Sequence, residues 1–181
     1  MRILRMRVEE DSEIFLAGDT QWGNAGTSES GWDALCERLS SDGDGARDRH
    51  LCLMGDLIEC ITIDDSRFSW DQSRIHTIRA QRDYAISRIE PVKQYLRILL
   101  RGNHEHRVAG NYGDISAELA SLLRCDYGGY VCVVECVSRR RGRLLFRLFL
   151  HHGFGRLTSN AKDSVQRRAN MMAALRQRLQ H

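Results

Sequence analysis

The residues of this chain that could do chemistry lie in four short polar stretches, each directly after an apolar run. They are Gly18-Asp19-Thr20-Gln21, Gly55-Asp56, Gly102-Asn103-His104-Glu105 and His151-His152-Gly153. Carboxylate, amide and imidazole groups at the end of a buried strand cost free energy unless they bind something. Oxygen and imidazole ligands favour Mn²⁺, Fe²⁺, Zn²⁺ or Mg²⁺ over a thiolate-bound metal. The four stretches therefore predict a site for divalent cations.

The apolar runs before these stretches predict the strands that would position them. The runs cover residues 14–17, 51–54, 97–100 and 144–150. Strand ends on one side of a sheet converge, so we expect the four polar stretches to face one pocket. One carboxylate could then bridge two ions about 3.5–4 Å apart, a geometry that activates water for attack on phosphorus.

Helical spacing, capping residues and turn signals predict the other elements. We expect helices at residues 32–39 with Ser30 as cap, 73–89, 115–123 with Asp114 as cap, and 164–179. An edge strand is predicted at residues 3–8, a turn at 127–130, and a hairpin of 131–137 with 144–150. Strands that interleave with helices predict a layered α/β or α+β fold.

Length and composition fit a single domain over residues 1–181 with a core of its own. No apolar run approaches the roughly 20 residues of a membrane-spanning helix, and the basic N-terminus lacks the long apolar region of a signal peptide. We therefore expect a cytoplasmic protein without a membrane partner. The net charge of +3 permits a polyanionic substrate without requiring one. The six cysteines form no CxxC pair, which favours reduced core residues.

The order of the polar motifs resembles that of the calcineurin-like metallophosphoesterase superfamily. The motifs are Gly-Asp-x-x-x-Gly, Gly-Asp-x-x-Glu, Gly-Asn-His-Glu and a late His-Gly. The stretches GDTQWG, GDLIE, DDSRF, RGNHE and HHGFG are most similar to the phage- and prophage-encoded branch. The resemblance covers about residues 15–160. It implies central β-sheets flanked by helices, and hydrolysis of phosphoesters with two divalent ions, of which Mn²⁺ is the first choice.

The resemblance also implies the metal ligands. Asp19 and Gln21 would serve the first ion, Asp56 would bridge both ions, and Asn103 would bind the second. A histidine after the late strand would complete the second site. His152 is the first choice because Gly153 follows it, with His151 as the alternative.

The same resemblance implies residues that act on the substrate. His104 would lie beside the scissile phosphate and stabilise its charge or protonate the leaving oxygen. Glu105 could orient His104. Arg101, Arg107 and Arg156 lie beside the expected pocket in the sequence and are candidates for phosphate contacts.

Two departures from the superfamily pattern bear on activity. Gln21 stands where the wider superfamily has histidine, so the first metal site is expected to be looser. The chain also lacks the Gly-His-x-His motif that closes the superfamily's site, where one histidine goes to each ion. We therefore expect a C-terminally incomplete domain that lacks its last strands, with weak metal binding and little activity.

The leading interpretation is a metal-dependent phosphoesterase that acts on phosphodiesters, with DNA as one candidate substrate. A phosphomonoesterase is the closest alternative. A degenerate or truncated module that keeps the fold without catalysis is a third. Each motif also has a plain structural interpretation, because Asp19 and Asp56 could be turn residues and the histidine pair could lie on the surface.

Overall fold

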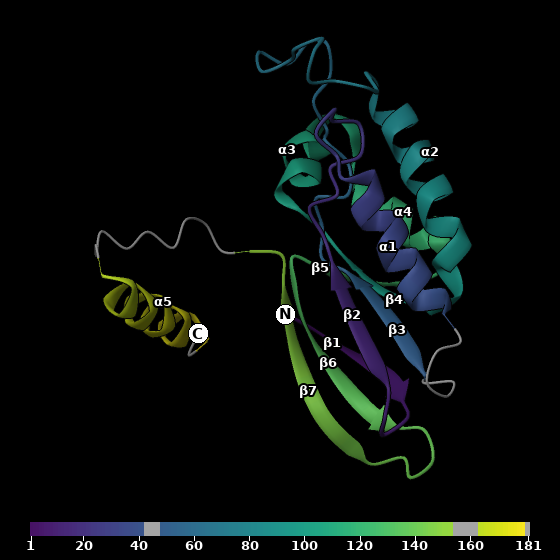
Figure 1. Cartoon of the computed structure of the whole chain (residues 1–181), viewed down its shortest axis with the longest axis vertical. Helices are drawn as coiled ribbons and strands as arrows, with labels where there is room; N and C mark the ends of the chain where they lie inside the picture. The colour runs from purple at the N-terminus through teal and green to yellow at the C-terminus, as the bar shows by residue number, and fades with distance from the viewer. Residues whose placement is uncertain (42–47, 154–162, 180–181) are drawn as a thin grey trace.

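The protein has two β-sheets in contact, and helices cover the outer face of one of them (Figure 1). The structure is a computed structural model that describes residues 1–41, 48–153 and 163–179. Strands and helices interleave along the chain, so the predicted layered mixture of α and β is confirmed. Within the described ranges, no helix combines the length and the apolar character needed to cross a membrane.

Four parallel strands form the sheet that positions the site, in the order β2-β3-β4-β5. Three of them match predicted strands: β2 (Glu13–Ala17), β3 (Arg49–Leu53) and β4 (Leu96–Leu100). The fourth, β5 (Asp126–Gly129), lies where the sequence predicts a turn, so that prediction is wrong. A Cβ at Gly128 would lie 2.4 Å from Cδ2 of Leu100, so glycine here lets β5 pair closely with β4.

The second sheet has the order β1-β6-β7. Its edge strand β1 (Arg2–Val8) runs parallel to β6 (Val131–Ser138), which pairs antiparallel with β7 (Leu144–His151) as the predicted hairpin. Residues of the inner face pack against the first sheet, and the shared core contains Met6, Val8, Cys52, Ile98, Leu100, Cys132, Val134, Cys136 and Leu150. All six cysteines are free thiols, as the sequence predicts.

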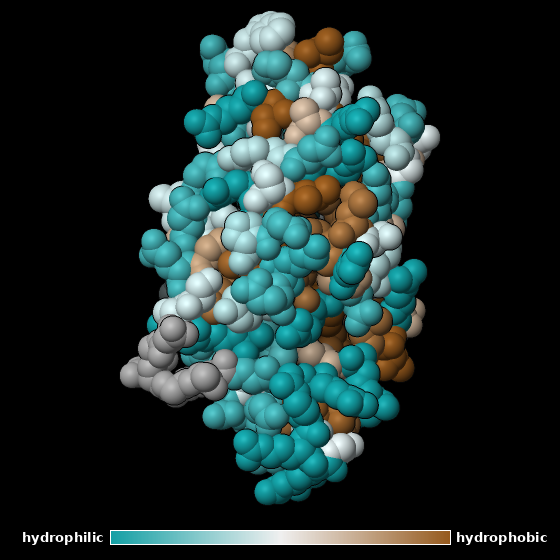
Figure 2. Space-filling view, turned by 90° about the vertical axis from the view of Figure 1, so that its right-hand side faces the viewer, coloured by the Kyte–Doolittle hydropathy of each residue, from teal (hydrophilic) through white to brown (hydrophobic). Residues whose placement is uncertain are grey.

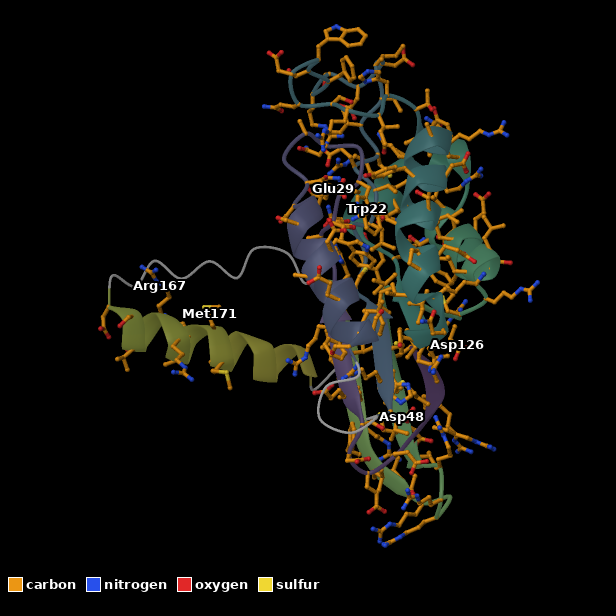
Figure 3. All side chains as sticks on the ribbon, turned by 45° about the vertical axis from the view of Figure 1, so that its right-hand side comes forward. Trp22, Glu29, Asp48, Asp126, Arg167 and Met171 are labelled. Carbon is orange, nitrogen blue, oxygen red and sulfur yellow. The ribbon has the colours of Figure 1, made fainter. Side chains whose placement is uncertain are left out.

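Three helices cover the other face of the first sheet: α1 (Glu29–Ser40), α2 (Ile78–Ile89) and α4 (Ile115–Leu123). They bury Trp32, Ala85 and Leu119 against it. A 3₁₀ helix, Glu90–Tyr95, follows α2. Seen from this side, the surface is largely hydrophilic, with hydrophobic patches between hydrophilic side chains (Figure 2). Helix α5 (Ser164–Leu179) stands apart from the sheets (Figures 1 and 3).

Two helices begin at other residues than the sequence predicts, and both differences come from capping. Helix α1 begins at Glu29 because the side chain of Ser28, not that of Ser30, accepts the Gly31 N–H. Helix α2 begins only after Thr77, whose hydroxyl accepts the Ala80 N–H. The segment before α2 is held elsewhere, since the N–H of Arg74 donates to the carbonyl of Gly23 (2.7 Å).

Helix α3 (Asn103–Tyr112) was not expected, because the sequence motif there predicts a loop. The Glu105 carboxylate accepts the N–H of Gly102 (3.1 Å) and so caps the first turn of this helix. Asp114 caps α4 as predicted, through the N–H of Ala117 (3.1 Å).

Candidate metal centre

The loops after β2 and β3 lie side by side and bring two carboxylates together. The N–H of Asp19 donates to the carbonyl of Gly55 (3.0 Å), and the N–H of Gln21 to that of Asp56 (2.9 Å). Asp19, Gln21 and Asp56 all have left-handed backbones, with φ of 53°, 46° and 51°. Non-glycine residues rarely adopt this conformation, and such strain often gathers at functional sites.

The loop after β3 also touches the start of α3. A Cβ at Gly55, where φ is 93°, would lie only 2.6 Å from the backbone N of Gly102. Only glycine therefore allows these two backbones to approach, which gives the Gly-Asp and Gly-Asn motifs a structural reason. Asp56, directly after Gly55, is 3% exposed as a result.

Glu105 fixes the position of the β3 loop. Its Oε1 accepts the N–H groups of Leu57 (2.7 Å) and Ile58 (3.2 Å), and its Oε2 accepts that of Asp56 (3.2 Å) as well as Gly102. Burial raises the pKa of Glu105, whereas these backbone donors favour the carboxylate. The contacts of Glu105 are thus with the loop that carries Asp56, not with the His104 ring.

His152 follows β7 and completes a cluster with the two aspartates. Ligand atoms of Asp19, Asp56 and His152 all lie within 4.8 Å of one another. The Nδ1 of His152 lies 2.7 Å from the carbonyl of Met54, which can only accept, so Nδ1 carries the hydrogen. The other nitrogen, Nε2, lies 3.3 Å from Oδ1 of Asp56 and 3.0 Å from Oδ1 of Asn103.

These separations fit a shared cation. Ligands at about 2.1 Å from a metal ion lie roughly 3.0–3.4 Å from one another in octahedral or tetrahedral geometry. Without a cation, a 180° turn of the Asn103 amide satisfies more hydrogen bonds, because its NH₂ then donates to His152 and Asp56 and its oxygen accepts the N–H of His104. A bound cation would require the orientation with the oxygen inward.

Protonation competes with a metal ion at this place. The hydrogen bond with Asp56 raises the pKa of His152 to about 9. Burial opposes ionisation of Asp56, but hydrogen bonds from His152 and from the backbone of His104 keep its pKa below the ordinary value. A divalent cation that binds here must therefore displace the proton of His152.

His151 and His152 lie on different sides of the second sheet. His151 pairs with Val131, its ring stacks on Phe149 at 6.2 Å, and its Nδ1 accepts the N–H of Gly153 (2.8 Å). Among the described residues, the structure thus brings His152 to the carboxylates and does not bring His151 there.

His104 turns one ring nitrogen towards the cluster. Its backbone N–H donates to Oδ1 of Asp56 (2.8 Å), and its Nδ1 lies 2.7 Å from the carbonyl of Glu59. Because that carbonyl only accepts, Nδ1 carries a hydrogen, and Nε2 lies 3.9 Å from Oδ2 of Asp56. The nitrogen left for a substrate is therefore Nε2.

Glu59 is a residue that the sequence reasoning missed. Its Oε2 lies 3.8 Å from Nδ1 of His104 and is buried without a hydrogen-bond partner in the described part of the chain. A buried carboxylate oxygen without a hydrogen bond is costly, so its place beside an imidazole points to a role for Glu59 at the site. The available signal was its position in the Gly-Asp-x-x-Glu motif, three residues after Asp56.

The predicted substrate arginines have different environments. Arg101 bonds to Asp114 (3.3 Å) and lies over the ring of Tyr130 at 5.0 Å. Arg107 is exposed on α3, and Arg156 lies outside the described residues. Tyr130, also missed in the sequence, is the aromatic neighbour of the site, with its ring 6.2 Å from that of His152.

Comparison of the chain with models of protein families, with curated proteins and with solved structures found no match. The chemistry of the site therefore has to be argued from its geometry. Two carboxylates, an amide and an imidazole converge at one end of the first sheet, and a second imidazole faces them. Such a set could hold one or two divalent cations and present a proton donor beside them.

Proposed function

We propose that this chain is a metal-dependent phosphoesterase whose metal ligands are Asp19, Asp56, Asn103 and His152. The observation that carries the proposal is the convergence of His152 Nε2 on the oxygens of Asp56 and Asn103, at 3.3 and 3.0 Å. The order of the motifs, which resembles that of metallophosphoesterases, supports the same activity. Mn²⁺ is the first choice of ion, and Fe²⁺, Zn²⁺ and Mg²⁺ are also compatible with these ligands.

The proposed ligands differ in how firmly they are held. The His152 imidazole is fixed by the Met54 carbonyl and lies beside the Asn103 amide. Asp19, the other carboxylate of the cluster, is exposed, and Gln21 of the same loop is half-buried. We expect one tighter and one weaker ion. Bound ions would neutralise phosphate charge and lower the pKa of a bound water.

The chain's own residues would then position the substrate and handle the proton. The Glu59 carbonyl fixes the tautomer of His104, so that Nε2 faces the phosphate. When protonated, Nε2 donates to the leaving oxygen and stabilises its charge. The backbone N–H of His104 holds the Asp56 carboxylate at the same time (2.8 Å).

Phosphodiesters are the proposed substrate class, with DNA among the candidates. The test measures hydrolysis of bis(4-nitrophenyl) phosphate and 4-nitrophenyl phosphate with and without Mn²⁺, in the wild type and in Asp56→Asn and His104→Asn. We expect Mn²⁺-dependent turnover of the diester, reduced roughly 10²- to 10⁴-fold by His104→Asn. Asp56→Asn is expected to weaken Mn²⁺ binding as well.

Three outcomes would contradict the proposal in different ways. Tight Mn²⁺ binding without turnover of either ester would indicate a non-catalytic metal-binding module. Preference for the monoester would move the substrate class to phosphomonoesters. Activity that persists in the double variant Asp56→Ala/His104→Ala would show that the catalytic assignment is wrong.

A further inference from the structure

A hollow of about 320 Å³ opens beside Asp19, between the end of β2 and the first turns of α1. β2 is the edge strand of its sheet, where only β3 pairs with it, and Leu16 and Ala17 at its end line the hollow. Trp22 and Glu29 mark the same end of α1 in Figure 3. A volume of this size lies within the range of roughly 300–1,000 Å³ typical of small-molecule sites.

Four apolar side chains line part of the hollow: Leu16, Ala17, Trp32 and Leu35. Trp32 is 4% exposed, its Nε1 donates to the carbonyl of Arg88 (3.0 Å), and its ring meets Trp22 edge to face at 4.9 Å. Leu35 and Ala17 pack partly against the core, whereas Leu16 is largely exposed. Such walls favour a flat apolar group over a charged one.

Three polar side chains also line the hollow. They are Asp19, which belongs to the candidate metal cluster, and the hydroxyls of Thr20 and Ser28. The Thr20 hydroxyl donates to the carbonyl of Leu57 (3.0 Å), so it is held in place. The hollow thus shares Asp19 with the cluster, and a ligand in it could turn its polar end towards that carboxylate.

The residues around His104 do not line the hollow. His104 contacts Glu59 and Asp56, on the loop after β3, whereas the hollow is formed by β2 and α1. If His104 acts on the leaving oxygen, the leaving group lies beside Glu59 and His104. The group beside Asp19 is then the one that stays on phosphorus.

We propose that this hollow binds the ester group that the phosphodiester retains, and that an aromatic group is preferred there over a small one. This inference rests on the proposed function, since it takes Asp19 as a metal ligand. It narrows the substrate to diesters with a flat, mainly apolar group, such as an aryl or nucleobase-bearing ester.

One test compares two diesters with the same leaving group, phenyl 4-nitrophenyl phosphate and methyl 4-nitrophenyl phosphate, in the presence of Mn²⁺. We expect kcat/KM to favour the phenyl diester roughly tenfold. Leu35→Phe, which fills the hollow, should bring the ratio close to one. Leu35→Ala, which enlarges it, should keep the preference, and Glu37→Ala, an exposed control on α1, should leave it unchanged.

A binding test does not depend on turnover. In a Trp70→Phe background only Trp22 and Trp32 remain, and 4-nitrophenylphosphonate, whose carbon–phosphorus bond resists hydrolysis, should quench their fluorescence saturably. Leu35→Phe should weaken this binding roughly tenfold, because the aryl group is excluded. Glu37→Ala should not change it.

The outcomes separate the two proposals. If Leu35→Phe removes the quenching and the protein has no esterase activity, the hollow binds an aryl group and the proposed function is overturned. If the protein turns over both diesters equally and Leu35→Phe leaves the quenching unchanged, the proposed role of the hollow is overturned. The proposed function is then retained. The absence of both turnover and quenching would overturn both.

Discussion

A Cβ atom at Gly102 would lie 2.1 Å from Oδ1 of Asp56 and 2.0 Å from its backbone N. The first residue of the Gly-Asn-His-Glu motif is therefore in direct contact with the carboxylate proposed to bridge the ions. The contact involves backbone, which cannot turn aside as a flexible side chain would. The place of Asp56 thus depends on the absence of a side chain at residue 102.

Gly102→Ala should push the β3 loop away from α3. We expect it to lower the free energy of unfolding by about 3 kcal/mol and to abolish Mn²⁺ binding. Urea unfolding and isothermal titration with Mn²⁺ would measure the two effects. Gly110→Ala in the same helix is the matched control, since a Cβ there meets nothing within 4 Å. It should stabilise the protein by roughly 0.5–1 kcal/mol, and equal effects of the two variants would refute the steric argument.

The neighbouring histidines should differ sharply in metal binding. His152→Ala removes a ligand atom that lies 3.3 Å from Asp56, so we expect the Mn²⁺ affinity to fall at least roughly tenfold. His151→Ala should change it less than twofold, because its ring stacks on Phe149 instead. Titration calorimetry of the two variants decides the matter, and a greater loss in His151→Ala would reverse the assignment.

Glu59→Gln should separate activity from stability. The substitution neutralises a buried oxygen without a hydrogen-bond partner, so we expect the free energy of unfolding to rise by about 1 kcal/mol. It also removes the negative charge 3.8 Å from Nδ1 of His104, so kcat should fall roughly tenfold with KM and Mn²⁺ affinity nearly unchanged. A loss of stability together with an unchanged kcat would show that Glu59 has only a structural role.

A buried histidine far from the site should make stability depend on pH. His50 is fully buried; its Nδ1 accepts from Arg97 (3.0 Å), and its Nε2 lies 2.8 Å from Asp48, which also binds Arg139. Burial lowers the pKa of His50, while the Asp48 carboxylate opposes that shift. The unfolded chain therefore binds this proton more tightly than the folded one. The contribution of neutral His50 to the free energy of unfolding is present above the ordinary pKa of about 6.5, and it is lost as the pH falls below that value.

We expect urea midpoints measured from pH 8 to 5 to fall more steeply for the wild type than for His50→Gln. The extra slope should reach at most about 1.4 kcal/mol per pH unit. The raised pKa of His152 acts with the opposite sign, but it is present in both proteins and cancels in the comparison. Parallel pH profiles for the two proteins would contradict the prediction.

Strands and capped helices could be predicted because their signals are local. The run Ile14–Ala17 and the Asp114 cap were read from neighbouring residues, and both agree with the structure. The strand at Asp126–Gly129 could not be predicted, since its glycines signal a turn unless one knows that Leu100 packs against Gly128. Helix α3 was missed although its cap is local, because Gly102 at the N-cap signals a turn and the Glu105 carboxylate three residues later was not recognised as the cap.

In the candidate site too, contacts between distant segments could not be predicted from the sequence. Asp19, Asp56, Asn103 and His152 could be found because each follows an apolar run, and the structure brings them close together. The contacts of Glu105 with the β3 loop, and of Glu59 with His104, join segments more than 40 residues apart. A sequence without its fold gives the residue types but not which carboxylate meets which partner.

His152 follows a strand of the second sheet, whereas Asp56 and Asn103 follow strands of the first. Any ion held by all three would join the two sheets at this end of the sandwich. The ion would cross-link Asp56 and His152, which are 96 positions apart, and so close a loop of the chain between them. Metal binding would then stabilise the contact between the two sheets. Removal of the metal by a chelator would weaken that contact at the same end of the molecule at which a phosphoester would be cleaved.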